Sequence, residues 1–149
     1  MSEIHEGEIH DGGCLCGAVR YRVRGQPARN SACHCTFCQK RTGSAFGLGA
    51  YFNDEAVESL TGARRAYEHR SDESGRWLRI EFCTTCGGTV TWTAEALPGM
   101  RAFAGGSFDD PQWYRVTRHG WMRSAHRWFT PPAGVEVFEK GTLPSPQKP

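Results

Sequence analysis

Apolar and polar side chains alternate along several short stretches of this chain, which is the period expected of β-strands with one buried face. In residues 19–24, three apolar side chains alternate with three arginines. The same alternation in residues 77–82 leads directly to Cys83. Further strands are predicted over residues 44–52, 57–61, 66–69, 89–93, 102–105, 114–122 and 135–138. Gly, Pro, Asp and Ser between these stretches supply the turns.

Helical periodicity is almost absent. Residues 36–42 suit one short helical turn, which Gly43 ends. Residues 44–52 mix small and aromatic side chains, which predicts a buried strand that another backbone approaches closely at Gly47 and Gly49. The pattern therefore predicts a mainly β protein of about ten short strands with little helix.

The length of 149 residues fits one domain with a sizeable core. We expect a flexible N-terminal arm over residues 1–11, which includes His5 and His10, and a folded domain over residues 12–141. The segment 142–149 contains three prolines and is predicted to be a disordered tail.

The charge distribution narrows the class of partner. The formal net charge is +2, and basic and acidic residues are interleaved rather than gathered in blocks. This distribution provides no cluster of basic residues that would bind nucleic acid. Residues 1–13 carry four acidic side chains and no apolar run, so we expect neither a signal peptide nor a membrane span, and a cytoplasmic protein.

Seven cysteines form the main chemical signal, and an odd count without an export signal favours reduced thiols and metal ligation over disulfides. They fall into three groups: Cys14/Cys16, Cys33/Cys35/Cys38 and Cys83/Cys86. Joining the two pairs leaves a closed four-sulfur site and an open three-sulfur site. Low loop entropy within the triplet favours this partition. Spacing alone also permits Cys14/Cys16 to join Cys33/Cys35, with Cys38 joining Cys83/Cys86.

Closed zinc sites are usually structural, whereas catalytic sites keep a position for water or substrate. The four-plus-three partition therefore predicts one structural and one reactive zinc. Three thiolates would leave the second metal with a net charge of about −1 and a preference for a fourth sulfur over activated water. The chemistry that suits such a site acts on the sulfur of a small thiol, including the making or breaking of a C–S bond.

Three segments resemble the signatures of the glutathione-dependent formaldehyde-activating (GFA) family, of which centromere protein V is a eukaryotic relative. They are the stretches around Cys14-Leu15-Cys16-Gly17, Cys33-His34-Cys35-Thr36-Phe37-Cys38 and Cys83-Thr84-Thr85-Cys86-Gly87-Gly88. Residues 119–128 are also similar to the C-terminal part of the family, so the resemblance extends from about residue 12 to about residue 141.

The resemblance implies a β-tent fold with two zinc ions. It places a structural zinc on Cys14, Cys16, Cys83 and Cys86, and a catalytic zinc on Cys33, Cys35 and Cys38. It also implies a carbon–sulfur lyase activity, which in reverse joins formaldehyde and glutathione to give S-(hydroxymethyl)glutathione. Glutathione is then the expected small-thiol partner.

Several residues outside the cysteines are also candidates for the site. Cations for the carboxylates of glutathione are available at Lys40, Arg41, Arg64, Arg65, Arg123 and Arg127. His34 lies between two ligands and suits either a structural hydrogen bond or catalysis, and His119 matches a family position near the site. We expect Phe46, Trp121 and Trp128 to belong to the core.

Two other functions compete with the enzyme. In a binding module, the zinc ions would only stabilise the fold, and a surface of the protein would bind another protein or a nucleic acid. In a redox or metal-buffering protein, the open triplet loses zinc and Cys35 and Cys38 form a disulfide.

Overall fold

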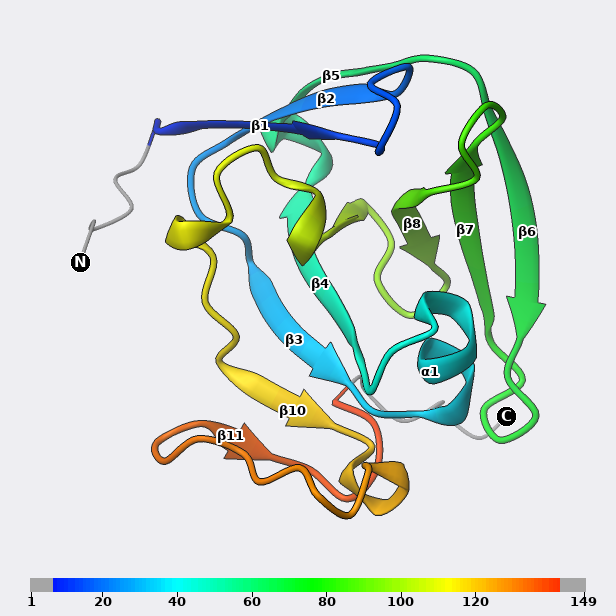
Figure 1. Ribbon diagram of the computed structural model, residues 1–149, viewed down its shortest axis with the longest axis vertical. Coiled ribbons are helices and arrows are strands. Elements are labelled where there is room, and N and C mark those ends of the chain that lie inside the picture. The colour runs from blue at the N-terminus through cyan, green and yellow to red at the C-terminus, as the bar shows by residue number, and fades with distance from the viewer. Residues whose placement is uncertain (1–6, 143–149) are drawn as a thin grey trace.

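The computed structural model describes residues 7–142, and within them the chain forms two β-sheets, one short α-helix and four 3₁₀ turns (Figure 1). A three-stranded sheet has the order β1-β2-β5, and an eight-stranded sheet has the order β11-β10-β3-β4-β9-β8-β7-β6. The strands of the small sheet are β1 (Ile9–Gly13), β2 (Arg20–Arg24) and β5 (Val57–Thr61). Those of the large sheet are β3 (Arg29–Cys33), β4 (Gly47–Asn53), β6 (Arg64–Arg70), β7 (Trp77–Cys83), β8 (Thr89–Ala94), β9 (Met100–Ala104), β10 (Arg118–Gly120) and β11 (Glu136–Val137). The mainly β prediction is confirmed, and the sheets stay open rather than closing into a barrel.

The small sheet lies across the top of the molecule in Figure 1 and covers one face of the large sheet. Along β2 buried and exposed side chains alternate as predicted, with Tyr21 and Val23 inside and the arginines outside. The outward arginines of β2 each meet a carboxylate: Arg20 pairs with Asp109, Arg22 with Asp11 and Arg24 with Glu58.

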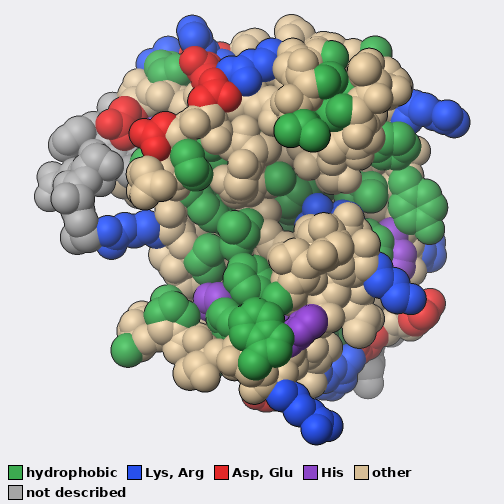
Figure 2. Space-filling view, in the orientation of Figure 1, with side chains coloured by type: hydrophobic (Ala, Val, Ile, Leu, Met, Phe, Trp, Pro, Cys, Tyr) green, Lys and Arg blue, Asp and Glu red, His purple; other side chains and the backbone are tan. Residues whose placement is uncertain are grey.

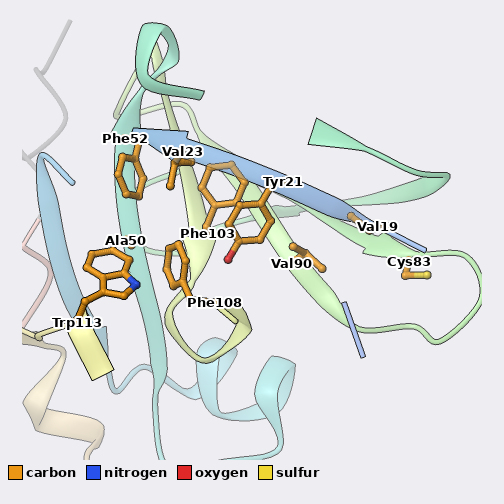
Figure 3. Packing of buried hydrophobic residues seen from close by; sticks show 10 residues of the cluster. All are labelled: Val19, Tyr21, Val23, Ala50, Phe52, Cys83, Val90, Phe103, Phe108 and Trp113. Carbon is orange, nitrogen blue, oxygen red and sulfur yellow. The ribbon is translucent and has the colours of Figure 1, made fainter. Parts of the chain in front are cut away.

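The main core lies between the two sheets (Figure 3). It contains Val19, Tyr21, Val23, Ala50, Phe52, Cys83, Val90, Phe103, Phe108 and Trp113. Because side chains alternate along a strand, β4 points Ala50 and Phe52 into this core and Tyr51 to the opposite face. There Tyr51 joins Ile80, Trp92 and Ala102 in a second cluster.

The short helix α1 (Thr36–Thr42) contributes Phe37 to this second cluster. Its bounds match the predicted helical turn, and Gly43 ends it in the left-handed conformation with φ 66°. The helix connects β3 to β4, whose nearest ends are paired at Cys33 and Gly47. It therefore folds back over the face of the sheet beside the cysteine triplet.

Two strands were not predicted. Strand β1 starts at Ile9, inside the expected flexible arm 1–11, where His10 is only 8% exposed. The remainder of that arm, residues 1–6, lies outside the described residues, as do residues 143–149 of the expected tail. Strand β3 has only Ala32 buried, so it carries no alternation. Both strands are held by pairing with their neighbours, which a local pattern does not report.

Three expectations about strands are corrected. The strand predicted over residues 114–122 is limited to β10, because the turn Pro111–Trp113 lies just before Tyr114 and Trp121 adopts a left-handed φ of 58°. The expectation of antiparallel strands fails at β10, which runs parallel to both β3 and β11. At Gly47 and Gly49 it is side chains, not another backbone, that occupy the space of a Cβ: Arg41 at the first, Tyr51 and Trp92 at the second.

The remaining short elements are the 3₁₀ turns η1 (Asp54–Ala56), η2 (Gly105–Ser107), η3 (Pro111–Trp113) and η4 (Met122–Ser124). Across residues 7–142, no helix is long and apolar enough to cross a membrane.

Candidate metal centres

Four cysteines from two distant parts of the chain meet at one end of the core. Cys14 and Cys16 lie in the loop between β1 and β2, Cys83 ends β7, and Cys86 lies in the turn that follows. Their four sulfur atoms lie within 4.8 Å of one another. The Sγ atoms of Cys14 and Cys16 are 3.6 Å apart, and those of Cys16 and Cys83 are 3.7 Å apart. Tetrahedral zinc with sulfur at about 2.3 Å needs sulfur atoms roughly 3.8 Å apart, so this set fits a zinc ion.

The backbone around this four-cysteine cluster donates hydrogen bonds to the sulfurs. Val19 N–H donates to Cys14 Sγ at 3.2 Å, and Thr85 N–H donates to Cys83 Sγ at 3.3 Å. Burial raises the pKa of Cys14, but the Val19 donor and the neighbouring thiols outweigh it and lower the pKa to about 6. Gly87 has a φ of 75°, which allows the turn to carry its donors toward the sulfurs, as expected for a zinc knuckle.

The other three cysteines form a local cluster where β3 passes into α1. Cys33 is the last residue of β3, Cys35 is the N-cap of α1, and Cys38 lies in its first turn. Their sulfurs lie within 4.8 Å of one another, and Cys35 Sγ accepts a hydrogen bond from the Cys38 N–H at 3.3 Å. Hydrogen bonds from the two other thiols hold the pKa of Cys35 well below its usual range. Three sulfurs fit three corners of a zinc tetrahedron, and no fourth His, Cys, Asp or Glu joins them among the described residues.

The fold thus groups the sulfurs as four and three, and the alternative partition, which joined Cys38 to Cys83 and Cys86, is wrong. Cys83 and Cys38 lie in separate clusters because β7 and β3 are separated in the sheet by β4, β9 and β8.

A buried histidine pair lies behind the three-cysteine cluster. His34, fully buried, and His119, 4% exposed, join their rings by a hydrogen bond of 2.9 Å between Nε2 and Nδ1. Burial lowers the pKa of both, that of His34 to about 4. The rings of Phe46 and Phe129 each lie 4.8 Å from that of His34. The neutral pair ties β3 to β10 next to Cys33, so His34 makes the structural hydrogen bond that was one of its two predicted roles.

A family model described as glutathione-dependent formaldehyde-activating enzyme matches residues 9–124. The chain belongs to the GFA family. A crystal structure of a Rhodobacter sphaeroides protein is also similar, with a TM-score of 0.54 and 22% identity. The similarity covers 71% of this chain and 96% of that chain, and it shows a shared fold.

This GFA chain carries a hydrogen-bonded link from the triplet to the surface that the sequence did not reveal. Gln39 Nε2 donates to the carbonyls of His34 and Ser124, both at 2.9 Å. Its Oε1 lies 3.1 Å from His126 Nε2, and Trp128 Nε1 donates to His126 Nδ1 at 3.1 Å. Because Nδ1 accepts, the His126 proton lies on Nε2 and donates to Gln39.

The link holds Trp128 at the surface, where its side chain is 71% exposed. The expectation that Trp128 belongs to the core is therefore wrong. Hydrophobic side chains gather through the centre of the face seen in Figure 2, and two histidine patches lie beside them in its lower half. Nothing in the spacing of Gln39 and His126 indicates their pairing, since they lie 87 residues apart in this GFA chain.

The six cations proposed for a carboxylate partner differ in burial and in ion pairing in this GFA structure. Arg64 is paired with Glu81, and Arg123 with Glu73. Three others are exposed and form no ion pair with an acid within residues 7–142: Lys40, Arg65 and Arg127. Arg41 alone is half-buried beside the triplet, with its guanidinium 4.6 Å from the centre of the Trp92 ring.

Proposed function

We propose that this protein is a zinc-dependent enzyme of the carbon–sulfur lyase type, acting on adducts of small thiols such as glutathione and formaldehyde. The observation that carries the proposal is the unequal grouping of the sulfurs, four in one cluster and three in the other. Membership of the GFA family supports glutathione and formaldehyde as the reactants. The cytoplasm, where glutathione keeps thiols reduced, is the compartment that we propose.

In the proposed reaction the thiol sulfur forms a bond to the carbon of formaldehyde. The C=O π bond breaks, and the proton lost by the thiol ends on the new hydroxyl oxygen, giving S-(hydroxymethyl)glutathione. No oxidant or reductant is needed. When bound at the triplet, zinc would supply a soft Lewis acid that lowers the pKa of an approaching thiol.

The protein's own residues would hold the two metal ions and keep the cysteines in position. Cys33, Cys35 and Cys38 would hold the catalytic ion, and Cys14, Cys16, Cys83 and Cys86 the structural one. The His34–His119 pair fixes the end of β3 against β10, so that Cys33 keeps its position while α1 carries Cys38. Phe46 and Phe129 pack around the histidines and exclude water from that side of the cluster.

The test is the zinc content of the purified protein combined with X-ray absorption at the zinc edge, with and without excess glutathione. We expect two zinc ions per chain and an average sulfur count that rises on adding glutathione, because only the open site gains a ligand. Formaldehyde consumption with glutathione then measures the activity directly.

Cys38→Ser provides the matched comparison. It leaves the four-cysteine cluster intact, so one zinc ion should remain and the response to glutathione should disappear. A wild-type protein with four protein ligands on every zinc would refute the proposal, as would one zinc ion and no response. Reversible zinc release with a Cys35–Cys38 disulfide under mild oxidation would point to the redox function instead.

A further inference from the structure

Arg41 is a half-buried cation with no acidic partner among residues 7–142. Its guanidinium lies over the ring of Trp92, at 4.6 Å from the ring centre. It also lies against β4 at Gly47, where an added Cβ would be 2.6 Å from Arg41 Nη2 and 3.4 Å from Cys38 Cβ. Gly47 is the residue paired with Cys33. The cation is therefore held at the edge of the three-cysteine cluster.

The surroundings of Arg41 keep it in one place. Trp92 is 4% exposed, and its Nε1 donates to Tyr51 Oη at 2.9 Å, which fixes the indole plane. The missing side chain at Gly47 leaves the space that the guanidinium occupies. A stacked guanidinium retains its planar set of N–H donors for a ligand at its edge.

Six other arginines among the described residues are neutralised by carboxylates. Those with an ion pair are Arg20, Arg22, Arg24, Arg64, Arg101 and Arg123. Elsewhere in the described chain, Arg29 and Arg118 are also half-buried without a carboxylate partner, but only Arg41 among these three lies at the edge of the three-cysteine cluster. Removing a cation from water without a partner costs free energy, so a cation in this position favours an anion that enters the site. Arg41 interacts electrostatically with Cys38 of the cluster, but its planar guanidinium matches a carboxylate better than a sulfur.

We propose that Arg41 binds a carboxylate of the thiol that enters the three-cysteine site, and so selects anionic thiols over neutral ones. This inference rests on the proposed function for the identity of the thiol. It makes Arg41 a specificity-determining residue, and it explains why Gly47 has no side chain.

The experiment measures binding to the zinc-loaded protein by calorimetry with three probes. Glutathione carries both a thiol and carboxylates, 2-mercaptoethanol carries the thiol alone, and S-methylglutathione carries the carboxylates without a free thiol. Arg41→Met removes the charge at similar length. We expect it to weaken glutathione and S-methylglutathione about tenfold or more, the loss of one charge-assisted pair, and to leave 2-mercaptoethanol unchanged.

Two further variants provide a control and an independent test of the same contact. Lys40→Met removes the neighbouring exposed cation of the same helix and should change none of the three affinities. Gly47→Ala keeps the charge but places a methyl where the guanidinium lies, so it should reproduce the loss even if Arg41→Met folds poorly. A thermal melt of each variant confirms that it is folded.

The outcomes separate this inference from the proposed function. Equal weakening of glutathione and 2-mercaptoethanol would overturn it, because Arg41 would then act on the cluster thiolates. Unchanged glutathione affinity would overturn it too. If no thiol adds a sulfur to the zinc but S-methylglutathione still requires Arg41, the proposed function fails and this inference stands. If the wild type binds none of the probes, both fail.

Discussion

At the scale of single residues, the local sequence pattern did not predict the burial of His10. It lies in a polar N-terminal stretch, yet its ring stacks on Trp113 at 3.7 Å between centres and is 8% exposed. Burial lowers its pKa, while the acidic groups that face it, Glu8, Asp110 and Asp11, only partly oppose this effect. The buried ring is therefore neutral at pH 7.

This burial predicts a pH dependence of stability. Below about pH 6.5 the unfolded chain takes up a proton at His10 before the folded chain does, so the free energy of unfolding falls as the pH falls. His10→Phe keeps the stacking and removes the titration. We expect urea unfolding to show a smaller loss of stability between about pH 6.5 and pH 5 in this variant.

The loss would shrink without vanishing, because His34 and His119 are also buried with lowered pKa values. Ile9→Val serves as the control, since it changes an exposed side chain on the same strand and removes no titrating group, and it should leave the dependence as in the wild type. A His10→Phe protein with the full wild-type dependence would contradict the assignment.

At the scale of elements, the connection from β5 to β6 joins the small sheet to the large one through only two residues, Gly62 and Ala63. Gly62 has a φ of 103°, and an added Cβ would lie 2.1 Å from the carbonyl oxygen of Ala18 and 2.8 Å from Val19 Cα. Both neighbours are backbone atoms, which do not move aside as a flexible side chain would. This turn therefore depends on glycine for both conformation and space.

Gly62→Ala is expected to lower the free energy of unfolding by about 2–4 kcal/mol, because it adds steric overlap to the cost of a positive φ. Gly75→Ala is the matched control, with a φ of 72° and nothing within 4 Å of the added Cβ. It should cost only about 1 kcal/mol, the backbone strain alone. Equal losses in chemical denaturation would mean that the contact with Ala18 does not matter.

At the scale of the whole molecule, the two cysteine clusters differ in what they connect. The four-cysteine cluster joins the β1–β2 loop of the small sheet to the end of β7 in the large sheet. The three-cysteine cluster joins only β3 to the helix that follows it. A metal in the first would cross-link the two sides of the main core, whereas a metal in the second would close a short loop.

Cys83→Ser and Cys38→Ser should therefore have different effects. We expect Cys83→Ser to lose one zinc ion and several kcal/mol of stability, with faster amide hydrogen exchange in β1 and β2. Cys38→Ser should also lose one zinc ion but keep its melting temperature within a few degrees. Metal analysis with thermal unfolding distinguishes the two, and an equal loss of stability would remove the division between a structural and a reactive site.

The sequence by itself determined the features that depend on near neighbours. Alternation predicted β2 and β7 because each strand packs one face on the core, and the bounds of α1 followed from Thr36 to Gly43. The spacing of Cys33, Cys35 and Cys38 predicted a cluster because a few residues of chain can bring three sulfurs together. Recognition of the GFA family depended on the same local motifs.

Only the tertiary structure decided the features that depend on distant pairing. It chose between the two partitions of the cysteines that spacing allowed, made β10 run parallel to β3, and placed His119 against His34. It also placed Arg41 over Trp92 and beside the three-cysteine cluster, which is a property of its surroundings and not of the residue. Local sequence limits which side chains are available, and the sheet order decides which of them meet.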